Sequence, residues 1–186
     1  QTALNLQNPL LPTYLIGLAS RDSLILEFSP TMISLILAGK VGSSIASEIG
    51  SMRVSEQIDA LEIMGVNSAS FLILPKIIAS MFFFPCLVIL SMGIGMIGAW
   101  VGGLSVDVTT TDFLYGLQYE FVPFYVTYAI IKTLFFAFLV SSISSYFGYY
   151  SKGGAISVGK SSTEAVVYSS IFILVFNFIL TKIILA

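Results

Sequence analysis

The feature that most constrains this chain is an apolar segment running from Phe71 to Leu104, which contains a single charged residue, Lys76. A helix needs roughly 20 consecutive apolar residues to cross a bilayer core of about 30 Å. Hydrophobic residues make up 56% of the 186 positions, only 10% are charged, and the mean hydropathy is +0.96. A soluble domain does not have this balance. The sequence therefore predicts an all-α integral membrane protein.

Four segments have the composition expected of spans: 30–50, 71–104, 123–150 and 165–186. The first of them, 21 residues long, corresponds to about 31 Å of helix. Residues 1–29 are interrupted by prolines and by the Arg21-Asp22 pair, so we expect an interfacial segment there. Ser29 followed by Pro30 is typical of an N-cap and first helical position, which predicts that a helix begins or restarts at this point.

The charges predict an orientation. Residues 40–76 carry Lys40, Arg53 and Lys76, and residues 148–165 carry two further lysines, whereas residues 105–122 carry acids and no lysine or arginine. The positive-inside rule places the basic segments in the cytosol and the acidic segment outside. With four spans, the C-terminus is then outside.

Small residues recur at every fourth position of the first span: Ser34, Ala38, Gly42, Ala46 and Gly50. This spacing places them in one row along a helix, where they allow another helix to approach closely. We expect this row to pack either at a twofold axis between two copies or against the 71–104 span of the same chain.

The sequence becomes charged directly after this row, with Arg53, Glu56, Asp59 and Glu62 set among apolar residues. This pattern predicts that the membrane helix runs straight into a short amphipathic helix. The three acids share roughly one face and have no bases opposite them within the helix. We therefore expect something outside the helix to meet them. Two interpretations remain open, a solvated helix between spans and a helix that docks on a soluble partner.

The segment AGKVGSSIASEIGSMRVSEQIDALEIMGV (38–66) resembles the signature segment of the MlaE-type permeases. These are membrane subunits of ABC transporters that work with MCE-domain proteins to move lipids between membranes. The resemblance extends through Pro75, Trp100 to Gly103, Gly148 to Gly159 and the closing NFILT at Asn177 to Thr181.

The resemblance implies that residues 1–186 form a single permease domain that lacks the family's N-terminal amphipathic helix and first span. It implies a multi-pass protein of the inner membrane, a homodimer that moves phospholipid. The expected partners are an ABC ATPase in the cytosol and a hexameric MCE-domain protein in the periplasm. The helix carrying Arg53, Glu56, Asp59 and Glu62 then corresponds to the coupling helix that contacts the ATPase.

Composition argues against chemistry in this chain. It has no histidine, and its only cysteine, Cys86, lies in an apolar span. The commonest general base and metal ligand are therefore missing, and one thiol cannot build a disulfide framework or a thiolate metal site. We expect no catalytic residues, no metal and no cofactor. The net charge of −2 and the absence of a basic run also argue against nucleic acid.

Residues 154–161, GAISVGKS, match the Walker A pattern GxxxxGK[ST]. A phosphate-binding loop of this kind follows a buried strand and opens a helix inside an α/β domain. Here the pattern lies in a predicted 18-residue loop between two membrane spans. We therefore interpret the match as a coincidence.

Three polar residues are predicted to lie in the outer half of the bilayer. Glu27 precedes the Pro30 helix start by one turn, Lys132 is nine residues into a span, and Asn177 is nine residues from the C-terminus. Nine residues of helix correspond to about 13 Å. Ionisable groups at this depth either pair or line a cavity. A structural Glu27–Lys132 ion pair and a lipid-headgroup site both remain open.

In the resembled family these positions often hold polar residues, with an acid commonly in place of Asn177, and lipid occupies an outward-facing pocket at the dimer interface. The resemblance therefore favours the lipid site. Two other classes of function are alternatives to the ABC permease. A secondary transporter would use Glu27, Lys132 and Asn177 as an ion or proton relay, but inverted repeats are not visible. An intramembrane enzyme would depend on Glu27, Glu48 and Asp59 without a histidine or a serine–base pair.

Overall fold

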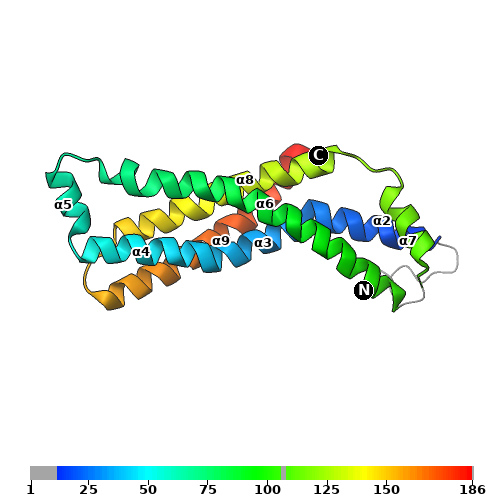
Figure 1. Cartoon of the computed structure of the whole chain (residues 1–186), viewed down its shortest axis with the longest axis horizontal. Helices are drawn as coiled ribbons and strands as arrows, with labels where there is room; N and C mark the ends of the chain where they lie inside the picture. The colour runs from blue at the N-terminus through cyan, green and yellow to red at the C-terminus, as the bar shows by residue number, and fades with distance from the viewer. Residues whose placement is uncertain (1–11, 106–107, 186) are drawn as a thin grey trace.

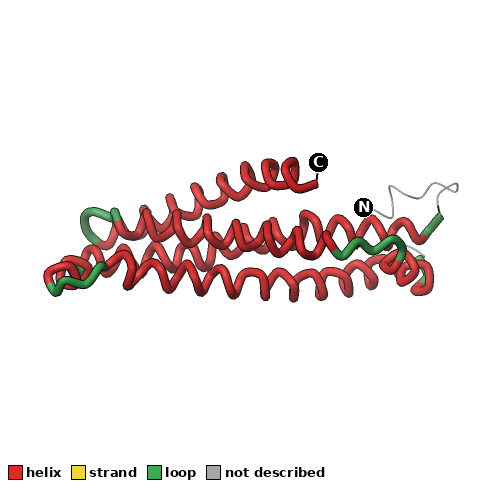
Figure 2. Tube along the Cα trace, turned by 90° about the horizontal axis from the view of Figure 1, so that it is seen from above, coloured by secondary structure: helices red, strands yellow, loops and turns green. Residues whose placement is uncertain are grey.

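The computed structural model describes residues 12–105 and 108–185, and these form an elongated bundle of helices without strands (Figure 1). Four helices are long and apolar enough to cross a membrane: Tyr14–Val54, Ser68–Leu104, Phe124–Tyr149 and Ala155–Ile184. They run side by side along the long axis of the molecule (Figure 2). The predicted class, a polytopic helical membrane protein, is confirmed.

The first long helix is continuous over 41 residues. Its parts are α2 (Tyr14–Ser23), the π-helical turn η1 (Leu24–Phe28), α3 (Ser29–Leu37), a second π-helical turn η2 (Ala38–Gly42) and α4 (Ser43–Val54). Such turns are rare and often mark functional sites. At about 61 Å this helix is roughly twice as long as a bilayer core of about 30 Å. Only part of it can lie in the hydrocarbon.

The predicted helix start at Pro30 is correct as a restart and wrong as a beginning. Regular α-helix resumes at Ser29 after η1, with Pro30 in its first turn. Ser29 is not a cap, because its backbone N–H donates to the carbonyl of Leu24 and the residue is buried. Of the predicted interfacial segment, residues 1–11 lie outside the described part of the chain.

The remaining elements are α5 (Gln57–Ile63), α6 (Ser68–Leu104), α7 (Thr110–Gln118), α8 (Phe124–Tyr149) and α9 (Ala155–Leu185). Helix α5 lies at one tip of the molecule and α7 at the other, so we call these the α5 end and the α7 end (Figure 1). The expected direct run from membrane helix to amphipathic helix is wrong. Glu56 adopts a left-handed conformation (φ 60°) between α4 and α5, and this turn folds α5 across the bundle tip.

Helix α8 is the centre of the bundle, packing against α4, α6 and α9. Its residues Phe136, Ala137 and Val140 are fully buried in a core completed by Ala38, Phe84 and Ile173. Burial of α8 on several sides makes it the least lipid-exposed of the long helices. A polar side chain on the buried face of α8, such as that of Lys132, is therefore held by protein rather than by lipid.

Helix α7 was not predicted and packs against α2 at the α7 end. The Thr109 hydroxyl accepts a hydrogen bond from the backbone N–H of Asp112 and caps the start of α7. At the other end of α7, buried Arg21 donates to the carbonyls of Leu117 and Tyr119. The predicted acidic segment also contained Asp107, which lies outside the described residues.

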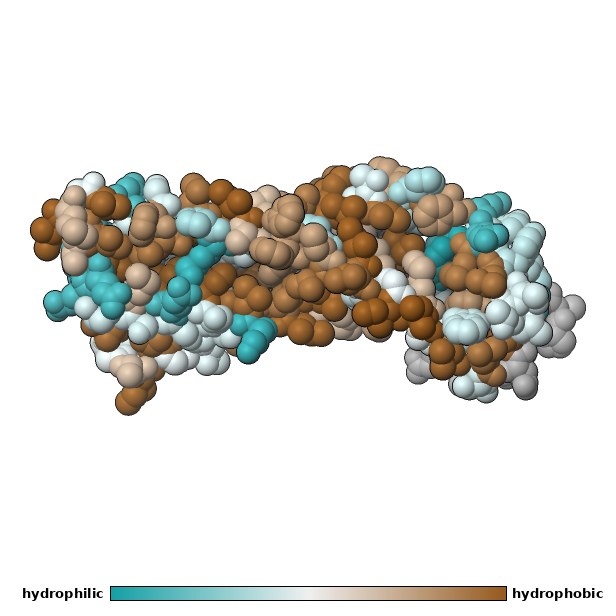
Figure 3. Space-filling view, in the orientation of Figure 1, coloured by the Kyte–Doolittle hydropathy of each residue, from teal (hydrophilic) through white to brown (hydrophobic). Residues whose placement is uncertain are grey.

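Side-chain polarity follows the long axis (Figure 3). Hydrophobic side chains cover most of the middle of the visible face, and hydrophilic ones gather toward its two ends. Large apolar residues that are exposed in the structure include Ile36, Phe82, Leu90 and Phe178. A broad exposed apolar surface of this kind suits lipid contact.

Candidate functional site

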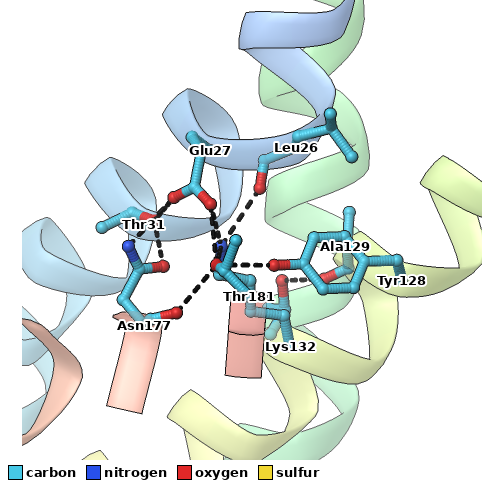
Figure 4. Close-up of polar contacts among 9 residues, drawn as sticks. Leu26, Glu27, Thr31, Tyr128, Ala129, Lys132, Asn177 and Thr181 are labelled. Carbon is cyan, nitrogen blue, oxygen red and sulfur yellow. Dashed lines mark hydrogen bonds and ion pairs between the residues drawn. The ribbon is translucent and has the colours of Figure 1, made fainter. Parts of the chain in front are cut away.

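The three polar residues predicted at similar depth come together in the bundle (Figure 4). Glu27 lies on η1, Lys132 on α8 and Asn177 on α9. Lys132 Nζ donates to Glu27 Oε1 at 2.8 Å, and Asn177 Nδ2 donates to Glu27 Oε2 at 2.9 Å. The carboxylate of Glu27 thus joins three helices that are far apart in sequence.

Pro30 contributes to this arrangement through its backbone. Proline has no N–H, so it cannot donate to the carbonyl oxygen four residues earlier, that of Leu26. This oxygen accepts a hydrogen bond from Lys132 Nζ at 3.1 Å. The proline predicted to start a helix therefore lies inside one, where it leaves an acceptor for the lysine.

Two threonines, which the sequence analysis missed, complete the cluster. Thr31 Oγ1 donates to Asn177 Oδ1 at 3.0 Å, and Thr181 Oγ1 lies 2.9 Å from Glu27 Oε1. Thr31 follows Glu27 by four residues and Thr181 follows Asn177 by four, so each pair shares one helix face. We call Glu27, Thr31, Lys132, Asn177 and Thr181 the Glu27 cluster. The i,i+4 spacing was the available signal, but hydroxyl residues are common in membrane helices.

The side chain of Lys132 is fully buried, and each proton of its ammonium group has an acceptor. Its side chain is 0% exposed, whereas that of Glu27 is 42% exposed. The ammonium group has three protons, and it has three acceptors: Leu26 O, Glu27 Oε1 and, at 3.4 Å, Thr181 Oγ1. The ring of Tyr128 lies 5.1 Å from Nζ and adds a cation–π contact. A ligand therefore meets the cluster first through the carboxylate side.

An apolar groove of about 610 Å³ is lined by residues that neighbour Glu27 in sequence, although Glu27 itself is not part of the lining. It lies between the η1–α3 segment and α6, and Phe28, the residue after Glu27, is one of its walls. Its other lining residues are Leu24, Ser29, Met32, Ile33, Ile36, Leu37, Leu87, Leu90, Ser91, Ile94 and Gly95. The volume is within the range of small-molecule pockets, about 300–1,000 Å³. A helix that presents a charged cluster and also lines an apolar groove is an arrangement that suits an amphipathic molecule.

The row of small residues is buried, and its members Gly42, Ala46 and Gly50 lie against α8, which was not one of the two predicted neighbours. A Cβ atom built on Gly42 would lie 2.8 Å from Ser144 Oγ, and one built on Gly148 would lie 2.8 Å from the carbonyl oxygen of Ala46. Ser34, Ala38 and Ala46 are 0% exposed, and Gly50 faces Gly148 and Val158. The correction has a simple cause: α8 carries its own small residues, so the two helices approach closely.

Two of the acids near α5 meet partners outside their own helix, as expected, and these partners belong to the same chain. Asp59 pairs with Arg53 at the end of α4 at 2.6 Å. Glu62 Oε1 accepts hydrogen bonds from the Tyr149 hydroxyl at 2.8 Å and the Ser68 hydroxyl at 3.0 Å. These bonds hold the pKa of Glu62 below its ordinary value, with Tyr149 as the larger cause. No ion pair of Glu56 is found among the described residues.

The Walker A pattern at residues 154–161 forms the beginning of a helix. Helix α9 starts at Ala155, ten residues before the predicted span, so the expected 18-residue loop is wrong. Helix α8 precedes the segment where a phosphate-binding loop would need a strand. The backbone is therefore not arranged to cradle phosphate.

Fold and site together define a polytopic helical membrane protein with an ion pair inside its bundle and an amphipathic helix folded across one tip. The chain belongs to the MlaE permease family: the family model described as "Permease MlaE" matches residues 1–183.

Relatives agree with this assignment. The chain is 42% identical over 161 residues to a probable ABC transporter permease protein of Rickettsia bellii and 37% identical over 161 residues to one of Synechocystis sp.. The alignments cover 86% of this chain and 62% and 61% of those proteins. It is 35% identical over 161 residues to the protein TRIGALACTOSYLDIACYLGLYCEROL 1, chloroplastic, of Arabidopsis thaliana, covering 84% of this chain and 45% of that protein. The chain thus spans less than two thirds of the length of these curated relatives.

Proposed function

We propose that the chain is the membrane-spanning part of an ABC transporter permease that moves phospholipid. Family membership supports the permease role, and the bacterial relatives are named as probable ABC transporter permeases. The plant relative carries the name of a diacylglycerol lipid. The observation that carries the lipid assignment is the Glu27 cluster together with an apolar groove of about 610 Å³, whose lining residues Leu24 and Phe28 lie within three residues of Glu27 in sequence.

In this proposal the α5 end faces the cytosol, in accord with the basic residues near it. An ATPase subunit docks on α5 and supplies ATP hydrolysis, so this chain needs no catalytic residues. An MCE-domain protein meets the α7 end in the periplasm. Two copies of the permease form a homodimer in the inner membrane. The phospholipid headgroup reaches the site of Glu27, Lys132 and Asn177 from the exposed carboxylate side of Glu27, and an acyl chain lies in the groove.

The outer face of α5 supports docking through apolar contact as well as charge. Ile63 is 87% exposed and Met64 68% exposed at a tip that the positive-inside rule places in water. Apolar side chains exposed to water favour a protein partner. Glu56 lies in the turn that precedes them and adds a charge at the rim.

Photo-crosslinking tests the lipid assignment. The full-length permease is reconstituted with its ATPase in vesicles containing labelled phospholipid, and a photoreactive residue is placed at position 27, 132 or 177. We expect labelling at these positions and ATP-dependent lipid transfer that Lys132→Ala abolishes. If none of the three labels while Lys132→Ala lowers only thermal stability, the ion pair is structural and lipid binds elsewhere. Transport driven by a proton gradient without ATP would instead favour the relay.

A further inference from the structure

Three residues from three helices meet beneath α5. Glu62 of α5 accepts from the hydroxyl of Tyr149, the last residue of α8, and from that of Ser68, the first residue of α6. The two hydroxyl oxygens are themselves 3.0 Å apart. We call Glu62, Ser68 and Tyr149 the Glu62 junction. Each hydroxyl has one proton, and both protons are donated to Glu62, so the junction fixes α5 relative to the ends of α6 and α8.

A second set of contacts holds the other side of α5. Arg53 at the end of α4 pairs with Asp59, and its guanidinium lies 5.6 Å from the centre of the Tyr149 ring. Ile58 is 0% exposed and packs with Ile45 and Ile49 of α4. The aromatic ring of Tyr149 therefore contacts the α4 side while its hydroxyl contacts α5. The two sets of contacts share Tyr149.

Helix α8 connects this residue to the Glu27 cluster. Tyr149 and Lys132 lie on the same uninterrupted helix, Phe124–Tyr149, about 26 Å apart along its axis. The segment between them is closely packed, with Phe136, Val140 and Ser144 each 0% exposed. A packed, regular helix moves as a unit, so a displacement of Tyr149 along the axis reaches Lys132 with little loss.

Two acids of α5 point toward the bundle, so other residues lie on the face of α5 that points away from it. The junction uses Glu62 and the Arg53 pair uses Asp59, whereas Ile63 and Met64 are free to meet a partner. One face of α5 therefore holds the bundle and the other is available for docking.

We propose that the Glu62 junction makes α5 and α8 move as one body, so that a partner pressing on α5 displaces the helix that carries Lys132. Glu62, Tyr149 and Ser68 act as positioning residues for transport and touch neither lipid nor nucleotide. This inference rests on the proposed function, because the force on α5 would come from the ATPase subunit that docks there. Its mechanical part, the rigid attachment of α5 to α8, is independent of that function.

The first experiment measures the attachment in the full-length permease. Spin labels are placed at Ala60→Cys on α5 and Tyr146→Cys on α8, both exposed, after Cys86→Ser and replacement of any other cysteines. We expect one narrow distance distribution that is unchanged by ATP and vanadate in the complex, and a broader one in Tyr149→Phe. Tyr150→Phe is the matched control, because Tyr150 is 61% exposed and makes no side-chain hydrogen bond within the described residues.

The second experiment measures lipid transferred per ATP hydrolysed in vesicles. A hydrogen bond to a charged group is lost in Tyr149→Phe, so we expect roughly a tenfold fall in this ratio. ATPase binding and hydrolysis should remain, and Tyr150→Phe should behave as the wild type. A normal ratio in Tyr149→Phe, or a wild-type distance that changes with nucleotide, overturns the proposal. A wild-type complex that transfers no lipid instead overturns the proposed function, and the spin-label distances still decide whether the junction is rigid.

Discussion

The Glu27 cluster and the Glu62 junction both hold helices together through a glutamate, but the first lies inside the bundle and the second lies at its exposed tip. Each uses one glutamate to tie helices together, and each glutamate accepts at least two side-chain hydrogen bonds. Inside the bundle the partner is a cation, Lys132, whose side chain is 0% exposed. At the tip the partners are neutral hydroxyls, and Glu62 itself is exposed. The comparison shows how surroundings decide which partner a carboxylate needs.

The physical reason is desolvation. A charge that loses its water and gains only neutral partners remains costly, whereas an opposite charge and further hydrogen bonds offset much of the cost. Lys132 has both kinds of partner: Glu27 supplies the opposite charge, and Leu26 O and Thr181 Oγ1 accept further hydrogen bonds. Glu62 keeps part of its hydration and does not need a cation in contact.

The largest effect is expected from Glu27→Ala, which leaves the buried Lys132 ammonium without its counter-charge. Breaking a buried pair from one side costs about 3–5 kcal/mol. The double variant Glu27→Ala/Lys132→Met should recover most of this loss, because the remaining charge is removed as well. Denaturant or thermal unfolding in detergent measures both variants.

A matched control for this prediction is Glu48→Ala, which breaks the Lys76–Glu48 pair at 2.6 Å. Glu48 is 57% exposed, so the loss should stay within about 1 kcal/mol. Equal effects of Glu27→Ala and Glu48→Ala would remove the contrast between an ion pair with a fully buried cation and an exposed ion pair, on which the comparison depends.

An intermediate effect is expected in the helix seam that connects the two regions. In Gly42→Leu the new side chain meets Ser144 of α8, and overpacking of this kind costs about 1–3 kcal/mol. Gly39→Leu is the control, because nothing lies within 4 Å of a Cβ atom built there. Unfolding of the detergent-solubilised chain compares the two. If Gly39→Leu is the more damaging, the seam lies on another face and α8 does not carry the connection between the regions.

Much of the Glu27 cluster was predictable because helical rise is constant. Counting residues from the ends of three spans placed Glu27, Lys132 and Asn177 at a common depth, and the structure brings them into contact. Counting residues did not predict that Pro30 leaves the Leu26 carbonyl oxygen free to accept from Lys132. A proline after a serine fits a helix start, and only the third dimension shows that Lys132 uses the acceptor it leaves free.

The Glu62 junction was less predictable because it depends on the rotation of a short helix about its own axis. Spacing showed that the acids share a face but not which way the face points. That direction is set by buried Ile58 and by Tyr149, a residue 87 positions away from Glu62 in sequence. The neighbour of the small-residue row was missed for a related reason. Such a row indicates close approach, but several helices can provide the other surface.

The smallest effect is expected from pH, and it tests the tip of the molecule alone. Hydrogen bonds from Tyr149 and Ser68 hold the pKa of Glu62 below its ordinary value. A carboxyl whose pKa is lower in the folded state stabilises the fold fully above the unfolded-state pKa, about 4.3 for glutamate, and this stabilisation is lost as pH falls through the lower folded-state value.

Wild type and Glu62→Gln should therefore differ in thermal stability near neutral pH, and the difference should shrink as pH falls below about 4.3. Glutamine keeps an acceptor oxygen for the two hydroxyls, so the difference reports the charge rather than the loss of contact. Glu56→Gln is the control, because no ion pair of Glu56 is found among the described residues, and the variant should follow the wild type at every pH. A Glu62→Gln difference that grows on acidification would mean that the protonated carboxyl is the better partner. The hydroxyls at the tip would then serve a neutral group, and the contrast with the charged Glu27 cluster would be one of protonation state rather than of solvent.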